Sequence, residues 1–449
     1  MAKRESNACL CRLLDETGWT QSQFATAVNR VGTEQGRPLR YDASAVNHWL
    51  GGTVPIQKVR PLILETLSRK LGRPIAEADA GFPSPPGQLS AQASTVEAVL
   101  ELGRQDMDPM NPSRRGVLGT ALFSVALTIP DWPDVVGRME AVQTGRASRI
   151  GHSDVATVEA MTEQLSDLDD RFGGRTARPM AAAFLVNTVG PHLRADAPED
   201  VRRAMMSAAS DLLYLTGYMA VDEGLHGLAQ QYYVKALELA GAADDHLTYC
   251  TTLRGMSVQA VDLGHNAHAL RLANAAAAAS PHAGPRMRAF LAGQQAHAYA
   301  ATGDHRNALQ LINEAEVAME RAESRAKAFG SYDPSSLAYH VAQVQFGLGD
   351  LAGSVKNMEE SSKLRHDVYR RTRVRYDAML AERQLKLGHL EAACSTWERV
   401  LDDYPLVQSG RADDRIVIMR SLLRPHLRNR TAHALFERAR SVSVPSRPA

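Results

Sequence analysis

The chain has 449 residues and a formal net charge of +1 at neutral pH. Its length exceeds that of a usual single domain, so we expect more than one packed core. A low aromatic content (6%) with abundant alanine, leucine, arginine and glutamate favours helices over sheets. Four cysteines, at positions 9, 11, 250 and 394, are too few and too scattered for a disulfide framework, so we expect buried thiols in a cytoplasmic protein.

The charge is distributed unevenly along the chain. Residues 1–75 contain eleven Lys and Arg against six Asp and Glu, which gives about +5 there and about −4 over the remainder. Such an excess of positive charge at one end is typical of a protein whose end contacts a polyanion.

Four amphipathic helices are predicted between residues 7 and 72. The first covers residues 7–16, and Thr20 can cap the second. Asp42 can cap the third, and the fourth runs from about Gln57 to Leu71. Apolar residues recur at helical spacing in all four and predict one small core: Leu10, Leu13, Leu14, Phe24, Ala25, Val28, Val31, Val46, Trp49, Leu50, Val59, Leu62, Ile63, Leu67 and Leu71.

The third helix, in YDASAVNHWLGG at 41–52, has an apolar back and a front of short side chains. Val46 and Trp49 turn inward, which leaves the front free. A helix that reads the DNA major groove needs this arrangement, with cations beside it for the phosphates. The alternative is a small helical bundle with solvated polar residues. The front residues are Ala43, Ser44, Asn47 and His48, and the flanking cations are Arg37, Arg40, Lys58 and Arg60.

The segments GWTQSQFATAV and DASAVNHWLGG resemble the Xre-type helix-turn-helix family, over about residues 7–72. In that family the Thr-Gln pair opens the second helix and the third helix enters the major groove. The loop between these two helices is longer here than the tight turn of the family. The resemblance implies that Gln21 touches phosphate, while Ala43, Ser44, Asn47 and His48 face base edges.

Residues 76–115 are predicted to be a linker with a short helix, which tethers an N-terminal domain at 1–75. FPSPPGQLS at 82–90 and MDPMNPSRRG at 107–116 have linker composition, and VEAVLELG lies between them. The apolar stretch GVLGTALFSVALTIP at 116–130 is too short to span a membrane. We interpret it as a buried helix in a connecting region, 116–152.

Residues 153–440 are predicted to be a repeat array, followed by a disordered tail at 441–449. Five segments place a Gly five residues before a small residue, and these glycines are spaced by 40, 39, 46 and 39 residues. The Gly would make the turn between two antiparallel helices, and such helix pairs must stack to bury their faces. The pairs are Gly224/Ala229, Gly264/Ala269, Gly303/Ala308, Gly349/Ser354 and Gly388/Ala393, with Tyr233, Ala273, Ile312, Met358 and Trp397 four positions later.

This pattern resembles tetratricopeptide repeats. The resemblance implies that the first helix of each repeat lines a concave face, where an extended peptide could be contacted by aromatic and hydrogen-bonding groups. The alternative is that these residues pack against neighbouring helices or a dimer partner. The inward residues implied are Tyr214, Tyr218, Arg254, His297, Tyr339 and Gln343.

Motifs for catalysis are absent from the sequence: it contains no GxxxxGK[ST], HExxH or GxSxG. We therefore expect neither enzyme activity nor a cofactor or metal. FGGRTAR at 172–178 is interpreted as a helix terminus. The Arg-rich run LRHDVYRRTRVR at 364–375 is interpreted as a solvated helix face, with a phosphate-contacting or partner surface as the alternative.

The combined architecture resembles actinobacterial transcriptional regulators of the NsdA type, which act in differentiation and antibiotic control, and also peptide-sensing Gram-positive regulators. The resemblance implies an all-α, cytoplasmic repressor that binds double-stranded DNA. A homodimer is expected because one short helix reads few base pairs, and paired half-sites about 34 Å apart solve this. A peptide or small-molecule effector would occupy the repeat groove. The alternative function is a protein-binding scaffold with no direct DNA role.

Overall fold

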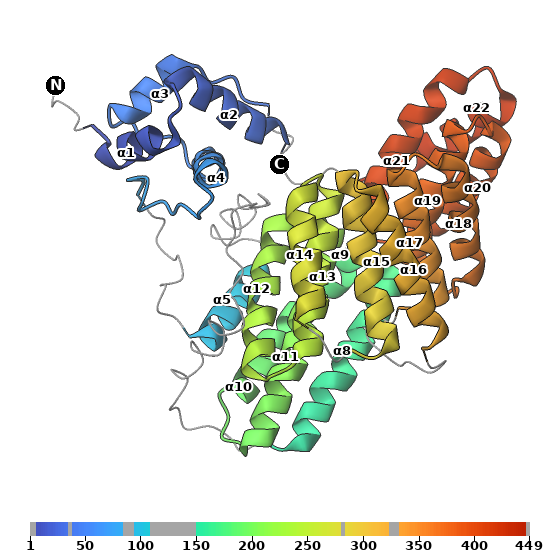
Figure 1. The fold of residues 1–449 in the computed structure, drawn as a ribbon, viewed down its shortest axis with the longest axis horizontal. Helices are drawn as coiled ribbons and strands as arrows, with labels where there is room; N and C mark the ends of the chain where they lie inside the picture. The colour runs from blue at the N-terminus through green and yellow to red at the C-terminus, as the bar shows by residue number, and fades with distance from the viewer. Residues whose placement is uncertain are drawn as a thin grey trace. The chain divides into compact units, whose positions relative to one another are not determined.

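The computed structural model describes residues 6–34, 38–83, 94–107, 150–279, 283–322 and 332–445. In these ranges every long regular element is a helix and no β-strand occurs, which confirms the all-α class and its solenoid-like arrangement (Figure 1). The chain divides into two compact units, an N-terminal unit up to residue 83 and an array that starts with Ser94. Among the residues described, none of the helices has the length and apolar character needed to cross a membrane.

The N-terminal unit consists of four helices whose starts follow the caps read from the sequence. The Thr20 side chain accepts a hydrogen bond from the Gln23 N–H at 3.2 Å, and the Gln23 side chain accepts one from the Thr20 N–H at 2.9 Å. Asp42 accepts a hydrogen bond from the Ala45 N–H at 2.9 Å. The fourth helix begins later than predicted because Pro61 is tolerated only in a first turn. The helices are α1 (Ala8–Thr17), α2 (Gln21–Glu34), α3 (Ala43–Leu50) and α4 (Arg60–Leu71).

The core of this unit contains the predicted apolar residues and extends further along the chain. Leu50 and Leu71 are only partly buried, and the other predicted core residues are buried. Ile75, Ala80 and Phe82 join the same cluster. The side chain of Asn7 donates to the Ala80 carbonyl at 2.9 Å. The unit therefore continues past residue 75, where the sequence analysis ended it.

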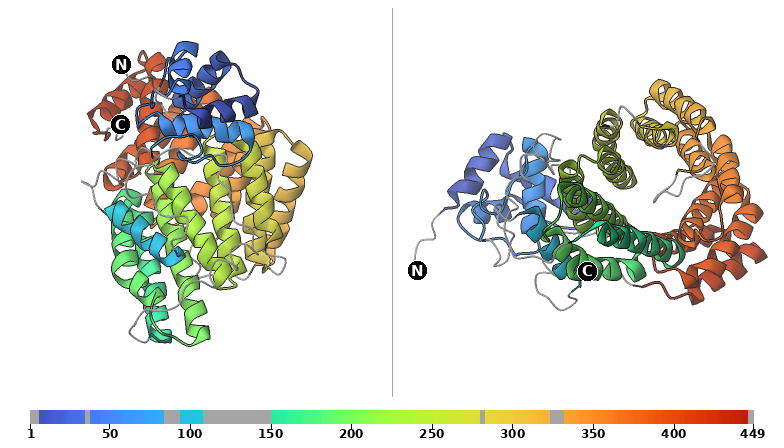
Figure 2. Two further views of the ribbon diagram at one scale, coloured as in Figure 1. Left: turned by 90° about the vertical axis from the view of Figure 1, so that its left-hand side faces the viewer. Right: turned by 90° about the horizontal axis from the view of Figure 1, so that it is seen from below.

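The array is a succession of antiparallel helix pairs that follow one another around a curved path (Figure 2, right). Two helices, α8 (His152–Phe172) and α9 (Gly174–Phe184), precede the repeats and continue through a π-helical turn (Leu185–Val189) into α10 (Gly190–Leu193). The pairs are α11 (Glu199–Asp222) with α12 (His226–Ala242), α13 (His246–Asp262) with α14 (Asn266–Ala278), α15 (Pro285–Thr302) with α16 (His305–Glu320), α17 (Pro334–Gly347) with α18 (Leu351–Leu364), α19 (Arg370–Lys386) with α20 (Leu390–Asp403), and α21 (Gly410–Leu423) with α22 (Arg430–Ser441).

The five predicted turn glycines lie between the two helices of their pairs. All have φ between 78° and 88°, the left-handed conformation that an L-residue adopts only at a cost. The small residue five positions later is fully buried in every repeat. The predicted turns and small contact residues are thus confirmed. The longer spacing of 46 residues, between Gly303 and Gly349, contains residues 323–331, which lie outside the described ranges.

The helix expected from VEAVLELG is present as α5 (Thr95–Met107), but it packs on the array and does not stand alone in a linker. Its Leu100 side chain lies where a Cβ at Gly190 would be, so only glycine fits there. Asp106 is buried, pairs with Arg178 and accepts the Tyr232 hydroxyl at 2.8 Å. The apolar connecting helix predicted at 116–130 lies outside the described residues.

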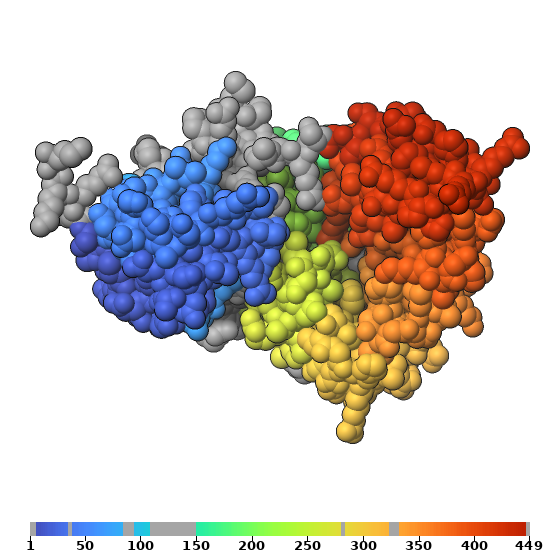
Figure 3. Space-filling model, turned by 90° about the horizontal axis from the view of Figure 1, so that it is seen from above, coloured from blue at the N-terminus to red at the C-terminus, as the bar shows by residue number. Residues whose placement is uncertain are grey.

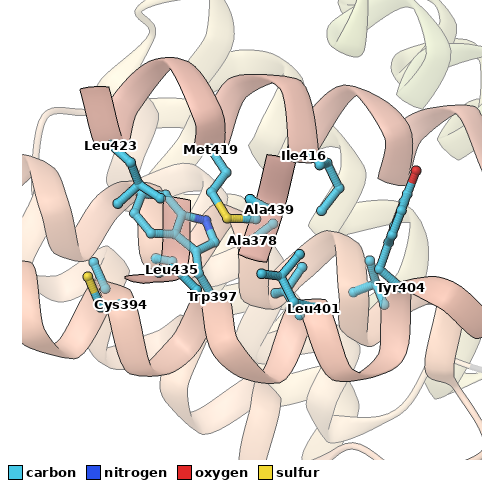
Figure 4. Packing of buried hydrophobic residues seen from close by; sticks show 14 of the residues in the cluster. Ala378, Cys394, Trp397, Leu401, Tyr404, Ile416, Met419, Leu423, Leu435 and Ala439 are labelled. Carbon is cyan, nitrogen blue, oxygen red and sulfur yellow. The ribbon is translucent and has the colours of Figure 1, made fainter. Parts of the chain in front are cut away.

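The C-terminal end of the array has its own core around Trp397. Figure 4 shows this side chain of α20 between Met419 and Leu423 of α21 and Leu435 of α22. Val442 and Val444 pack against the same cluster. Helix α22 thus includes Ser441, and the first residues of the predicted tail contact the core.

Candidate functional site

The two ends of the array meet, so its helices surround an interior. The Gln408 N–H donates to the Phe172 carbonyl at 2.6 Å, and the Ser409 hydroxyl donates to Asp222 at 2.8 Å. At Gly173, with φ of 91°, an added Cβ would lie 2.4 Å from the Gln408 carbonyl oxygen. FGGRTAR therefore contains a helix terminus, as predicted. The absence of a side chain at Gly173 leaves room for the backbone of Gln408. Helices α8 and α19 also contact each other. Figure 3 shows the face of the array on which the surface runs from yellow-green through yellow and orange to red.

Arg371 of α19 is the main ionic contact across this closure. Its guanidinium lies 3.0 Å from carboxylate oxygens of Asp169 and of Asp170, and 3.7 Å from Asp222. Its Nε donates to the Asp169 carbonyl at 3.1 Å. Arg371 is 5% exposed and Arg375 is 9% exposed. The interpretation of the run 364–375 as a solvated face is therefore wrong, because two of its arginines neutralise carboxylates of earlier helices.

The acidic side of the closure binds protons unusually tightly. Burial is the largest cause and raises the pKa of Asp169 to about 8, although Arg371 lowers it; the nearby Asp222 and Asp170 add to the increase. Asp262 behaves in the opposite way. Burial would raise its pKa, but Arg375 and Arg411 lower it below the usual range. The Arg411 guanidinium lies 2.6 Å from an Asp262 carboxylate oxygen.

A cavity of about 420 Å³ lies inside the closed array. Helices α8, α11, α13, α15, α17 and α19 supply its walls, so groups from both ends of the array border one space. The stacked pair Tyr339 and Tyr376, with ring centroids 3.8 Å apart, forms one part of the wall. The aromatic lining residues among those described are Tyr214, Tyr218, Phe290, Tyr332, Tyr339, His340, Tyr369 and Tyr376, and the charged ones are Glu163, Asp167, Asp169, Asp170, Arg254, Asp333, Arg365 and Arg371.

Four of the six residues expected at the inner surface line this cavity: Tyr214, Tyr218, Arg254 and Tyr339. Gln343 does not line it. Its side-chain N–H donates to the Tyr339 hydroxyl at 2.8 Å and its oxygen accepts from Arg383, so it orients the tyrosine. His297 does not line it either, and burial lowers its pKa to about 4. The alternative of packing against neighbours therefore describes these two residues.

Sequence reasoning did not identify the cavity residues whose positions have no counterpart in the repeat motif. Tyr339 lies ten residues before its turn glycine, but the same offset from Gly388 gives Ala378 and not Tyr376. Asp169 and Asp170 belong to α8, which precedes the first repeat and has no counterpart in the motif. No local signal links either set to the cavity, because closure alone brings them there.

The outward side of α3 is arranged largely as the sequence predicts. Ser44, Asn47 and His48 are exposed, while Val46 and Trp49 are buried beneath them. Ala43 is only partly exposed, since it begins the helix next to the loop. This side of the helix thus offers a hydroxyl, an amide and an imidazole to a partner.

The cations expected beside α3 divide into two kinds. Arg40 and Lys58 are exposed, and neither forms an ion pair within the described part of the chain. Arg60 is half-buried and donates to the carbonyls of Pro55 and Pro83, at 3.0 Å each, so it holds loops together. Gln21 is the half-buried first residue of α2, and Arg37 lies outside the described residues.

The long loop before α3 is fixed by a residue that the sequence analysis did not single out. Asn29 of α2 accepts from the Tyr41 N–H and donates to the Tyr41 carbonyl, both at 2.8 Å. The Tyr41 ring then meets Trp49 edge-on at 5.0 Å. The entry to α3 is thereby fixed relative to α2 although the loop is longer than a tight turn.

Comparison with known proteins relates the N-terminal unit alone to a family. A family model described as the SP15 N-terminal domain matches residues 10–83. The matched range ends one residue beyond Phe82, where the core of this unit also ends. No curated protein matches the chain. Within the described ranges, no group of three or more His, Cys, Asp or Glu side chains is placed to hold a metal ion.

Proposed function

We propose that the protein is a sequence-specific DNA-binding transcriptional regulator. The observation that carries this proposal is α3, a short helix anchored by Val46 and Trp49 that exposes Ser44, Asn47 and His48. Short hydrogen-bonding side chains on an anchored helix can reach base edges in the major groove. The resemblance to Xre-type helix-turn-helix proteins supports the same role.

Phosphate contacts would come from the exposed cations of the N-terminal unit. Arg73 pairs with Glu16, and Arg69 pairs with Glu34 and Glu65, so these two arginines are already neutralised. Arg40 and Lys58 keep their charge available and are the best candidates. Such contacts position the protein on the duplex, and the α3 side chains would supply the specificity.

The array would act as the sensing and assembly part of the regulator. Its cavity supports effector binding, and its tetratricopeptide-like pairs are suited to protein contacts, including a second copy of the chain. The resemblance to regulators of the NsdA type makes repression of differentiation or secondary metabolism the proposed biological role, in the cytoplasm. If an effector binds, its coupling to DNA affinity must be reciprocal.

The test is DNA capture followed by a salt titration. The purified full chain is mixed with fragmented genomic DNA of the organism that encodes it, and the retained fragments are sequenced. We expect enriched fragments, bound with an affinity that falls as salt rises, because phosphate contacts release counterions. No enrichment, or an affinity that does not respond to salt, would instead favour the scaffold function.

Sedimentation on the enriched fragment tests the dimer. We expect two chains per site and half-sites about 34 Å apart, or a multiple of that spacing. A chain that stays monomeric at micromolar concentration and on DNA would contradict this part of the proposal.

A further inference from the structure

Five acidic and three basic side chains border the array cavity, and the acidic ones are each satisfied by a partner or by solvent. Asp169 and Asp170 are paired with Arg371. Asp333 caps α17 by accepting a hydrogen bond from the Ser336 N–H at 2.7 Å. Glu163 and Asp167, the remaining acidic lining residues, are exposed to solvent and therefore screened. Each acidic group bordering the cavity thus already has a partner or water.

Two cavity cations, Arg254 and Arg365, form no ion pair within the described ranges. Arg365 donates to the Ser361 hydroxyl at 3.0 Å and lies over the Tyr376 ring, whereas Arg254 has an N–H left without an acceptor. Among the described residues, no carboxylate lies within ion-pair distance of its guanidinium. The group lies 4.1 Å from the centroid of the Phe290 ring, and its Nη2 lies 3.4 Å from the His340 Nε2. Its Nε is buried without an acceptor. A half-buried cation held this way favours an anion, because an unpaired buried charge is costly.

His340 cannot compensate that charge, but it fixes the geometry around it. Burial and the nearby Arg254 hold the pKa of His340 well below its usual range, so the ring is neutral. A neutral ring that accepts from Arg254 at Nε2 carries its proton on Nδ1. Nδ1 then donates to the Tyr332 hydroxyl, 2.7 Å away. The hydroxyl proton of Tyr332 is thereby left as a donor beside the guanidinium.

The rest of the cavity wall suits a flat apolar body. Tyr214 and Tyr218 lie with ring centroids 6.5 Å apart on α11, and Tyr339 of α17 stacks on Tyr376 of α19 in the same cavity wall. At Gly255 of α13 an added Cβ would lie 2.8 Å from Tyr214, so this glycine makes room for the ring. The aromatic side chains therefore form an apolar part of a wall that also carries charged groups, and the volume lies within the range of small-molecule sites, about 300–1,000 Å³.

We propose that this cavity binds a small aromatic carboxylate, with its carboxylate on Arg254 and its ring system between the tyrosines. Both ends of the array meet around the site, which favours a compact ligand over the extended peptide that an open groove would accept. The inference rests on the proposed sensing role of the array only for its effect on DNA. Binding itself is measured without DNA, so either proposal can fail separately.

The experiment compares two probes of the same shape, 2-naphthoate and its uncharged amide 2-naphthamide. Binding to the full chain is measured by calorimetry in the absence of DNA. We expect the acid to bind at least tenfold more tightly than the amide, because only the acid neutralises Arg254. Equal affinities, or no binding of the acid at millimolar concentration, would overturn the proposal.

Substitutions then test which residue causes the preference for the acid over the amide. Arg254→Gln should bind the acid and the amide with equal affinity, and Arg254→Lys should keep part of the preference. Arg306→Gln is the control and should match the wild type, because Arg306 is exposed on the outer helix α16. A preference for the acid that survives in Arg254→Gln would refute the assignment. Circular dichroism melting checks that each variant is folded, and the comparison of acid with amide on the wild type stands without any variant.

Discussion

Closure of the array depends on Arg371, so Arg371→Met should open it. The substitution keeps the length and apolar stem of the side chain but leaves the carboxylates of Asp169, Asp170 and Asp222 without their cation. Breaking a buried ion pair costs about 3–5 kcal/mol, because the remaining charge stays desolvated. Below pH 8 Asp169 is protonated for much of the time, so fewer negative charges are left without a cation in the variant. We therefore expect a loss of about 3 kcal/mol at pH 6.

The assay is urea unfolding followed by circular dichroism, with hydrogen exchange read over α8 and α19. Arg373→Met is the matched control, because Arg373 lies on the same helix and contacts Asp403 at 2.6 Å, but its side chain is 24% exposed. A solvent-accessible ion pair of this kind contributes about 0–1 kcal/mol to the free energy of unfolding. A loss for Arg371→Met no larger than for the control, or unchanged exchange in α8, would refute the closure.

Three further outcomes are expected. Arg40→Ala should weaken binding to all DNA sequences alike, whereas Asn47→Ala should change the preference among sites by about 1–3 kcal/mol, and equal effects in competition assays would contradict the roles assigned to them. Gly388→Ala should cost about 1–2 kcal/mol of unfolding free energy, because φ is 84° there, and Gly388→Asn should cost less since Asn tolerates this region. The raised pKa of Asp169 favours the folded state below its unfolded value near 4, and this contribution is lost as pH rises to about 8. Asp169→Asn should remove that decline, so an unchanged difference between wild type and variant from pH 4 to 8 would argue against it.

The parts of the fold that sequence could predict are those fixed by local chemistry. Helical periodicity identified the buried residues of the N-terminal unit, and the spacing of glycine and alanine identified the turns of the repeats. The same register placed Tyr214, Arg254 and Tyr339 on the inner surface. Each of these depends on residues a few positions apart, where the geometry of a helix or a turn determines the neighbours.

The parts that sequence could not predict depend on contacts between distant residues. Arg371 and Asp169 are separated by 202 positions, and nothing near either one specifies the other. An arginine-rich helix has the same composition whether it faces solvent or a buried carboxylate cluster. Likewise, α5 packs on the array through the fit of Leu100 against Gly190. The linker-like composition on both sides of α5 gives no indication of this contact.

The closure and the cavity share side chains, which ties ligand binding to the shape of the array. Arg371 lines the cavity and lies 5.2 Å from the centroid of the Tyr218 ring, while it also pairs with α8. A ligand that fits only the closed array stabilises closure by about 2.7 kcal/mol at a concentration 100 times its Kd. That is close to the cost expected for losing Arg371, so binding is strong enough to act as a switch. Saturating 2-naphthoate should therefore slow hydrogen exchange in α8, and unchanged exchange with ligand bound would show that the cavity and the closure are not coupled.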